Sequence, residues 1–205
     1  MHMDDQLDNT RDRYNFYSPK VLMGTVGIFN SVLDPYSVLI GDKIKLGRNN
    51  VFYPNVIIEC TDFGEISIGN DNTFYPGTYV FSSEGSIVIG DSNEFGVGGC
   101  TIRANMPEAD IRIGNNGRYC GGADIMGQTT LGNGSQILGN ITVQSCALAA
   151  GGTFKDPDPD KRASVLKGYG LARGIALSVG EVLNGMGNFA EGKVEQQSAY
   201  HPKKS

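Results

Sequence analysis

An aliphatic residue followed by glycine recurs along this chain of 205 residues, and this repeat constrains the fold more than any other feature. Dipeptides of this kind begin at Leu46, Ile68, Ile89, Ile113 and Leu131, which places them 22, 21, 24 and 18 residues apart. Each spacing is three groups of six residues with an insertion of zero to six. A fixed period of this length is typical of repeat architectures, in which each repeat packs on the next.

Within each period a bulky side chain returns at every sixth position, and turn-forming residues lie between. Asn50, Asn72 and Asn93 each follow the aliphatic residue by four positions, and asparagine tolerates a positive φ angle. This pattern predicts three short strands and three corners for each triangular coil, with coils stacked as parallel strands about 4.8 Å apart. The bulky side chains expected to point inward are Ile68, Phe74, Val80, Ile89, Phe95, Ile113, Tyr119, Ile125, Leu131, Ile137 and Val143.

An antiparallel meander or sandwich is the alternative for alternating apolar residues among Gly and Asn. Its turns come at irregular spacings of about 8–12 residues and would not hold an 18-residue phase through five segments. The segments themselves, such as IGNDNTFYPGTYV and LGNGSQILGNITV, resemble the hexapeptide-repeat superfamily. The resemblance implies an all-β, left-handed parallel β-helix. That fold serves acyltransferases, carbonic anhydrases and non-enzymatic assembly subunits, so it does not select a function.

The chain divides into four segments by pattern. We expect an N-terminal arm over 1–20, a β-helix of about seven triangular coils over 21–170, a C-terminal α-helix over 171–184 and a tail over 185–205. The helix is predicted because apolar residues recur there at helical spacing, although two glycines weaken it. These apolar residues are Leu171, Ile175, Val179, Val182 and Leu183.

Composition limits the kinds of partner and the cellular location that we expect. The chain has 17 Lys and Arg against 22 Asp and Glu, a net charge of −5, which argues against nucleic acid as a partner. No apolar run approaches the ~18 residues that span a bilayer, and residues 1–20 do not form a secretory signal, so we expect no membrane association. Four cysteines do not make a disulfide framework, which favours a cytoplasmic location.

Histidine is nearly absent. His2 and His201 are the two in the chain, and both lie in the terminal segments. The superfamily's carbonic anhydrases bind zinc through three histidines, and its acyltransferases use one histidine as general base. We therefore expect no metal site and no cofactor, with acetyl coenzyme A as the alternative.

Other residues are the alternative candidates for chemistry. Asp124, Cys120 and Glu108 are the alternatives for a catalytic group, although cysteines in such a wall are usually small buried residues and the acids are usually solvated turn residues. Five basic residues near the end of the repeat could bind the phosphates of a coenzyme or form the rim of a protein interface, although three aspartates between them reduce the positive field. These residues are Lys155, Lys161, Arg162, Lys167 and Arg173.

The run from 87 to 144, with IG-x-x-N turns followed by aromatic and Gly-Cys or Cys-Gly positions, resembles the small hexapeptide subunits of the dynactin pointed-end complex. This resemblance implies a non-catalytic scaffold that acts through protein–protein assembly, with a protein partner or self-association through the ends or faces of the β-helix. The segment DPDPDKRASVLKGYGLARG departs from that pattern. The alternative is an acetyl-coenzyme-A-dependent acyltransferase with a catalytic residue other than histidine.

Overall fold

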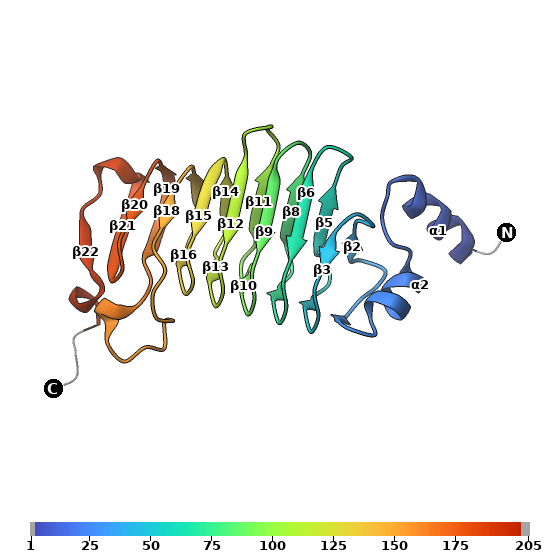
Figure 1. Cartoon of the computed structure of the whole chain (residues 1–205), viewed down its shortest axis with the longest axis horizontal. Helices are drawn as coiled ribbons and strands as arrows, with labels where there is room; N and C mark the ends of the chain where they lie inside the picture. Colours follow the sequence, from blue (N-terminus) through green and yellow to red (C-terminus); the bar gives the residue numbers. More distant parts are fainter. Residues whose placement is uncertain (1–2, 202–205) are drawn as a thin grey trace.

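The computed structural model describes residues 3–201. Parallel strands stack into a solenoid, and each coil contributes one strand to each of three faces in turn (Figure 1). The chain is an all-β parallel β-solenoid, consistent with the left-handed β-helix expected from the repeat. Face 3 contains seven strands, so the described residues form seven coils, which is the predicted number.

The strands of each face pair in register from one coil to the next. Face 1 consists of β1 (Ser31–Val32), β4 (Val51–Phe52), β7 (Thr73–Phe74), β10 (Glu94–Phe95), β13 (Arg118–Cys120), β16 (Gln136–Leu138) and the start of β19 (Val165–Arg173). Face 2 consists of β2 (Leu39–Ile40), β5 (Ile57–Cys60), β8 (Thr78–Ser82), β11 (Cys100–Ala104), β14 (Ala123–Met126), β17 (Ile141–Gln144) and the end of β19. Face 3 consists of β3 (Lys45–Leu46), β6 (Glu65–Ile68), β9 (Ser86–Ile89), β12 (Asp110–Ile113), β15 (Gln128–Leu131), β18 (Ala147–Leu148) and β20 (Ala176–Leu177).

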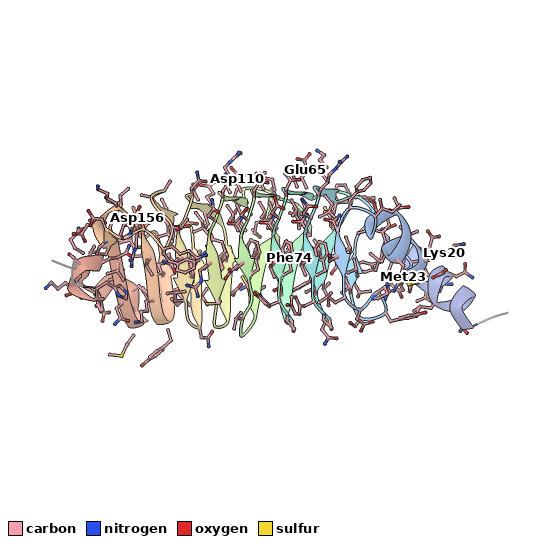
Figure 2. The ribbon with its side chains drawn as sticks, turned by 90° about the horizontal axis from the view of Figure 1, so that it is seen from below. Lys20, Met23, Glu65, Phe74, Asp110 and Asp156 are labelled. Atoms are coloured by element: carbon pink, nitrogen blue, oxygen red, sulfur yellow. The ribbon has the colours of Figure 1, made fainter. Side chains whose placement is uncertain are left out.

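The core fills the inside of the solenoid, as the sixfold pattern predicts. All eleven side chains expected to point inward are at most 3% exposed. Three of them, Phe74, Phe95 and Tyr119, continue a column of stacked rings that begins at Phe52, with neighbouring centroids 5.0 to 5.4 Å apart. Charged side chains such as Glu65 and Asp110 project outward (Figure 2).

A ladder of buried asparagines joins the coils at one corner. The Asn72 amide nitrogen donates to Asn50 Oδ1 at 3.0 Å and to the Gly90 carbonyl at 2.9 Å. Asn72 Oδ1 in turn accepts from the Asn93 backbone N–H at 2.9 Å, so each side chain serves the coils on both sides. These asparagines mark a corner, as the sequence predicts, but they do not themselves take a positive φ. Asn49, Asp71 and Ser92, each one position earlier, have φ of 58° to 59°.

The ladder ends where the sequence changes from Asn to Gly. The Gly117 N–H donates to Asn93 Oδ1 at 2.8 Å, and a Cβ on Gly117 would collide with the Tyr119 hydroxyl. That hydroxyl lies 3.0 Å from Ser135 Oγ, a buried hydrogen bond that occupies the corner in the next coil. A phenol and a serine therefore replace two asparagines at this point.

Helical turns cover the N-terminal end of the solenoid. α1 (Met3–Arg13) falls within the expected arm, and α2 (Pro19–Val21) continues into the π-helical turn η1 (Leu22–Val26). Arg11 is 5% exposed and donates to the carbonyls of Pro35 and Tyr36, which ties α1 to the first coil. Leu22 is fully buried against the core. No helix within 3–201 is long and apolar enough to cross a bilayer.

The predicted α-helix over 171–184 is wrong, because this segment continues the solenoid. Its residues belong to the end of β19, to β20 and to β21 (Glu181–Asn188), which pairs with β19 in parallel. Gly170 shows the reason: its φ is +120°, and a Cβ there would strike the Gly187 carbonyl of the next coil. A left-handed glycine at a corner stops a helix and lets the chain turn into the next strand.

The expected tail over 185–205 is structured as far as residue 201. It contains the end of β21, η3 (Phe189–Glu191), β22 (Val194–Gln196) and η4 (Gln197–Ala199). β22 runs antiparallel to β21 and covers the last edge of the sheet, while Phe189 is 1% exposed at the end of the core. Both ends of the solenoid are therefore covered by the chain's own segments.

Replacing Asn72 with Ala is expected to lower the free energy of unfolding by about 2–3 kcal/mol, because buried hydrogen-bonding groups of the neighbouring coils lose their partner. Urea denaturation measures this effect. The matched control is Asn70→Ala, two residues away on the exposed side of the corner, where water can replace the lost amide. Equal losses for the two variants would contradict the role of the ladder.

Candidate functional site

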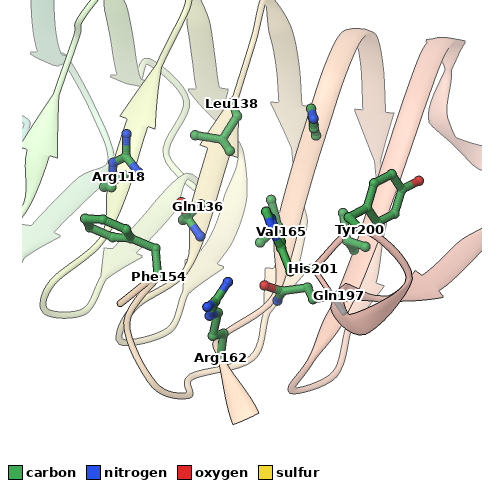
Figure 3. Close-up of a pocket in the computed structure, with 11 residues that line it drawn as sticks. Arg118, Gln136, Leu138, Phe154, Arg162, Val165, Gln197, Tyr200 and His201 are labelled. Carbon is green, nitrogen blue, oxygen red and sulfur yellow. The ribbon is translucent and has the colours of Figure 1, made fainter. Parts of the chain in front are cut away.

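A pocket of about 250 Å³ lies on the outside of face 1 at the last coils. Figure 3 shows Arg118 and Phe154 together at one end of this pocket and Tyr200 at the other. Its lining residues are Arg118, Gln136, Leu138, Phe154, Arg162, Val165, Lys167, Val182, Gln197, Tyr200 and His201.

The floor of the pocket consists of outward-facing side chains on adjacent strands. Side chains alternate along a strand, so where Ile137 and Leu166 point into the core their neighbours point outward. In the parallel register Gln136 lies beside Val165, and Val165 lies beside Val182. Both valines are 5% exposed, because two segments project over this part of the face.

The first of these segments is residues 149–164, which leave the coil between β18 and β19 and which we call the excursion. It contains the 3-10 turn η2 (Pro159–Lys161). Arg162 follows this turn, and its Nε donates to the Asp156 carbonyl at 2.8 Å. Phe154 packs under Arg118, whose guanidinium carbon lies 4.3 Å from the ring centroid.

The aspartates of the excursion accept hydrogen bonds from the backbone. Asp156 Oδ1 accepts from the Asp158 N–H at 3.0 Å, and Asp158 Oδ1 accepts from the Asp160 N–H at 3.2 Å. Asp160 Oδ1 accepts from the Ser198 N–H at 3.0 Å, which joins the excursion to the C-terminal turn. Aspartates commonly make such local turns. None of the three lines the pocket.

The second segment is the C-terminal turn, residues 197–201, which Gln197 holds in place. Gln197 is 4% exposed, and its Nε2 donates to the Ala163 carbonyl at 2.7 Å. Its own carbonyl accepts from the N–H groups of Tyr200 and His201 at 3.0 and 2.9 Å. This anchor directs Tyr200 and His201 to the mouth of the pocket.

The lining is positively charged. Arg118, Arg162 and Lys167 contribute cations, and among the described residues no Asp or Glu lines the pocket. Arg118 Nε lies 3.6 Å from Glu94 Oε2, and Lys167 Nζ lies 5.9 Å from the centroid of the Tyr200 ring, a cation–π contact.

The structure separates the five basic residues singled out in the sequence. Arg162 and Lys167 line the pocket. Lys155 lies on the other side of Phe154, with its Nζ 5.4 Å from the ring centroid. Lys161 is exposed and lies 3.9 Å from Asp158 Oδ2, and Arg173 donates to Gln144 on face 2 at 2.9 Å.

Two pocket residues were missed in the sequence. Arg118 belongs to β13, far from the basic cluster along the chain, and only the pairing of β13 with β16 and of β16 with β19 brings it there. His201 belongs to the segment 185–205, which the sequence predicts as a tail. Its position depends on the antiparallel pairing of β22 with β21, which the repeat pattern does not predict. His2 lies outside the described residues.

The three alternative catalytic candidates are not among the residues that line the pocket. Asp124, on β14 in face 2, accepts two hydrogen bonds from Arg103, at 2.9 and 2.6 Å. Cys120 ends β13, and burial raises the pKa of its thiol, which lowers the fraction of reactive thiolate. Glu108 is exposed in the loop between β11 and β12. Within 3–201 no group of three or more His, Cys, Asp or Glu side chains is placed to hold a metal ion.

Replacing Gln197 with Ala is expected to release the C-terminal turn from the excursion, at a cost of about 1–3 kcal/mol, because the buried Ala163 carbonyl loses its donor. Hydrogen exchange at the amides of Tyr200 and His201 measures the loss of protection. Gln196→Ala, at the exposed neighbouring position, is the control. Unchanged protection in the Gln197 variant would show that another contact anchors the turn.

No protein-family model and no curated protein matches this chain. Among solved structures it is similar to UDP-N-acetylglucosamine O-acyltransferase (LpxA) from Moraxella catarrhalis RH4, with 14% identity and a TM-score of 0.37 over 86% of this chain and 76% of the other. It is also similar to LpxA from Acinetobacter baumannii, with 12% identity and a TM-score of 0.38 over 84% and 74%. Similarities this low do not bear on the activity of this chain.

Proposed function

We propose that this chain is an acyltransferase of the hexapeptide-repeat type, with His201 as the general base. The observation that carries the proposal is the position of His201 at a pocket that three cationic side chains also line. The resemblance of the repeats to that superfamily supplies the class of reaction, and the superfamily's acyltransferases use one histidine as base.

The reaction transfers an acyl group from the thioester of acetyl coenzyme A to an acceptor hydroxyl or amine. The acceptor's hydroxyl oxygen or amine nitrogen attacks the thioester carbonyl carbon. As it does so, the imidazole of His201 removes the acceptor's proton. The carbon–sulfur bond then breaks, and the proton passes to the leaving thiolate of coenzyme A. A well-placed general base contributes about 10²–10⁴-fold to such a rate.

The pocket suits the smaller of the two substrates. Its volume of about 250 Å³ lies below the roughly 300–1,000 Å³ typical for drug-sized ligands, so it does not accommodate all of coenzyme A. A second pocket of about 120 Å³, which shares Arg118 and Phe154 with the first, is bordered by Lys155 and also by Glu94. We assign the phosphates of the acyl donor to that pocket.

The non-catalytic scaffold hypothesis has less support. It rested on the resemblance of residues 87–144 to the dynactin subunits, which no comparison shows, and on the lack of a histidine near candidate chemistry. His201 lines a pocket, and in the described residues β22 covers one end while the turns before β1 cover the other. Self-association through a face stays a prediction, which the mass of the protein in solution tests.

Acetyl-coenzyme-A-dependent turnover with a panel of amines and sugars tests the proposed activity, followed by release of the free coenzyme A thiol. We expect His201→Gln to lower kcat by about 100-fold or more with little change in the unfolding transition. The matched control is His2→Gln, the same substitution at the chain's other histidine. Background turnover by the unmodified protein with every acceptor would contradict the proposed function, as would full activity in His201→Gln.

A further inference from the structure

The pocket has a charge opposite to that of the chain around it. The whole sequence carries a net charge of −5, whereas the lining contributes three cations and, within 3–201, no acid. The excursion aspartates direct their carboxylates to backbone N–H groups, and none of the three lines the pocket. The positive charge is therefore concentrated where a small molecule can enter.

Two of these cations have capacity left for a ligand. Arg162 uses its Nε for the Asp156 carbonyl, and within 3–201 its terminal guanidinium nitrogens have no carboxylate partner. Lys167 likewise pairs with no carboxylate among the described residues and contacts only the ring of Tyr200 at its charged end. A guanidinium and an ammonium in this state suit an oxyanion, since charge-assisted hydrogen bonds are stronger than neutral ones.

The remaining lining residues are complementary to an apolar, ring-shaped part of such a ligand. Leu138, Val165 and Val182 form an apolar floor, and Phe154 and Tyr200 stand at the two ends. Flat apolar surfaces of this kind contact the C–H faces of a ring, while Gln136 and Gln197 contribute amides at the edge. The volume fits one sugar-sized ring with one charged substituent.

We propose that this pocket binds a small acceptor bearing an oxyanion, a phosphate or a carboxylate on a sugar-sized body. The charges of Arg162 and Lys167 attract the anion, and the acceptor's hydroxyl or amine faces His201. The role as acceptor rests on the proposed acyl transfer, whereas the binding of the anion does not.

Calorimetric titration with three matched probes tests the binding: glucose 6-phosphate, glucuronate and glucose. We expect one or both anionic probes to bind and glucose not to bind, and the anion that binds identifies the group. Arg162→Gln and Lys167→Gln should each weaken binding about tenfold or more, and salt should weaken it further. Because the Lys167 side chain is exposed, we expect Lys167→Gln to fold. That variant therefore tests the proposal even if Arg162→Gln unfolds.

The control is Arg112→Gln, the same change at an exposed arginine on face 3, which should leave binding unchanged. Equal binding of glucose, no binding of either anion at millimolar concentration, or equal effects of the Arg112 and Arg162 variants would overturn the inference. Anion binding that depends on Arg162 without acyl transfer would refute the proposed function alone. Transfer to a neutral acceptor that is unaffected in Arg162→Gln would refute the inference alone.

Discussion

Hydrogen bonding between buried asparagines at one corner fixes how the coils stack, and the rest of the structure depends on that register. Asn50, Asn72 and Asn93 each connect to the coil before and the coil after, with Asn72 and its neighbours at most 1% exposed. A slip by one residue would leave these amides buried without partners, at about 1–3 kcal/mol each. Because the register holds, outward residues of successive coils line up, and a surface site can be assembled from strands distant in sequence.

The sequence predicts most of this solenoid because its strongest signal, a bulky residue at every sixth position, is also its packing requirement. The C-terminal part shows the limit. Leu171 and Ile175 have helical spacing, yet Gly168, Gly170 and Gly174 have φ of +114°, +120° and +63°. Positive φ angles at these glycines turn the chain at corners. The strands of the preceding coil present backbone N–H and C=O groups, with which this segment pairs as strands. The competing signal was glycine at 168, 174 and 180, six residues apart, each with a positive φ in the structure.

The site was less predictable than the fold for a physical reason. Arg162 and Lys167 are close in sequence and could be recognised as basic neighbours. Arg118 joins them only through two steps of strand pairing, and His201 only through β22 and the anchoring amide of Gln197. Contacts of this range depend on the register of the whole stack, which no local pattern encodes.

The alternating Asp-Pro segment connects this fold to the chemistry of the pocket. A proline after Asp156 and another after Asp158 keep the chain extended, which lets each carboxylate reach an N–H two residues further on. These hydrogen bonds thus stabilise the excursion that carries Arg162, and their acceptor oxygens point to the backbone. Since exposed charges are screened over about 8 Å at physiological ionic strength, the acidic surface elsewhere has little effect within the pocket. An acidic protein can therefore present a cationic site to a small anion while its remaining surface repels larger polyanions.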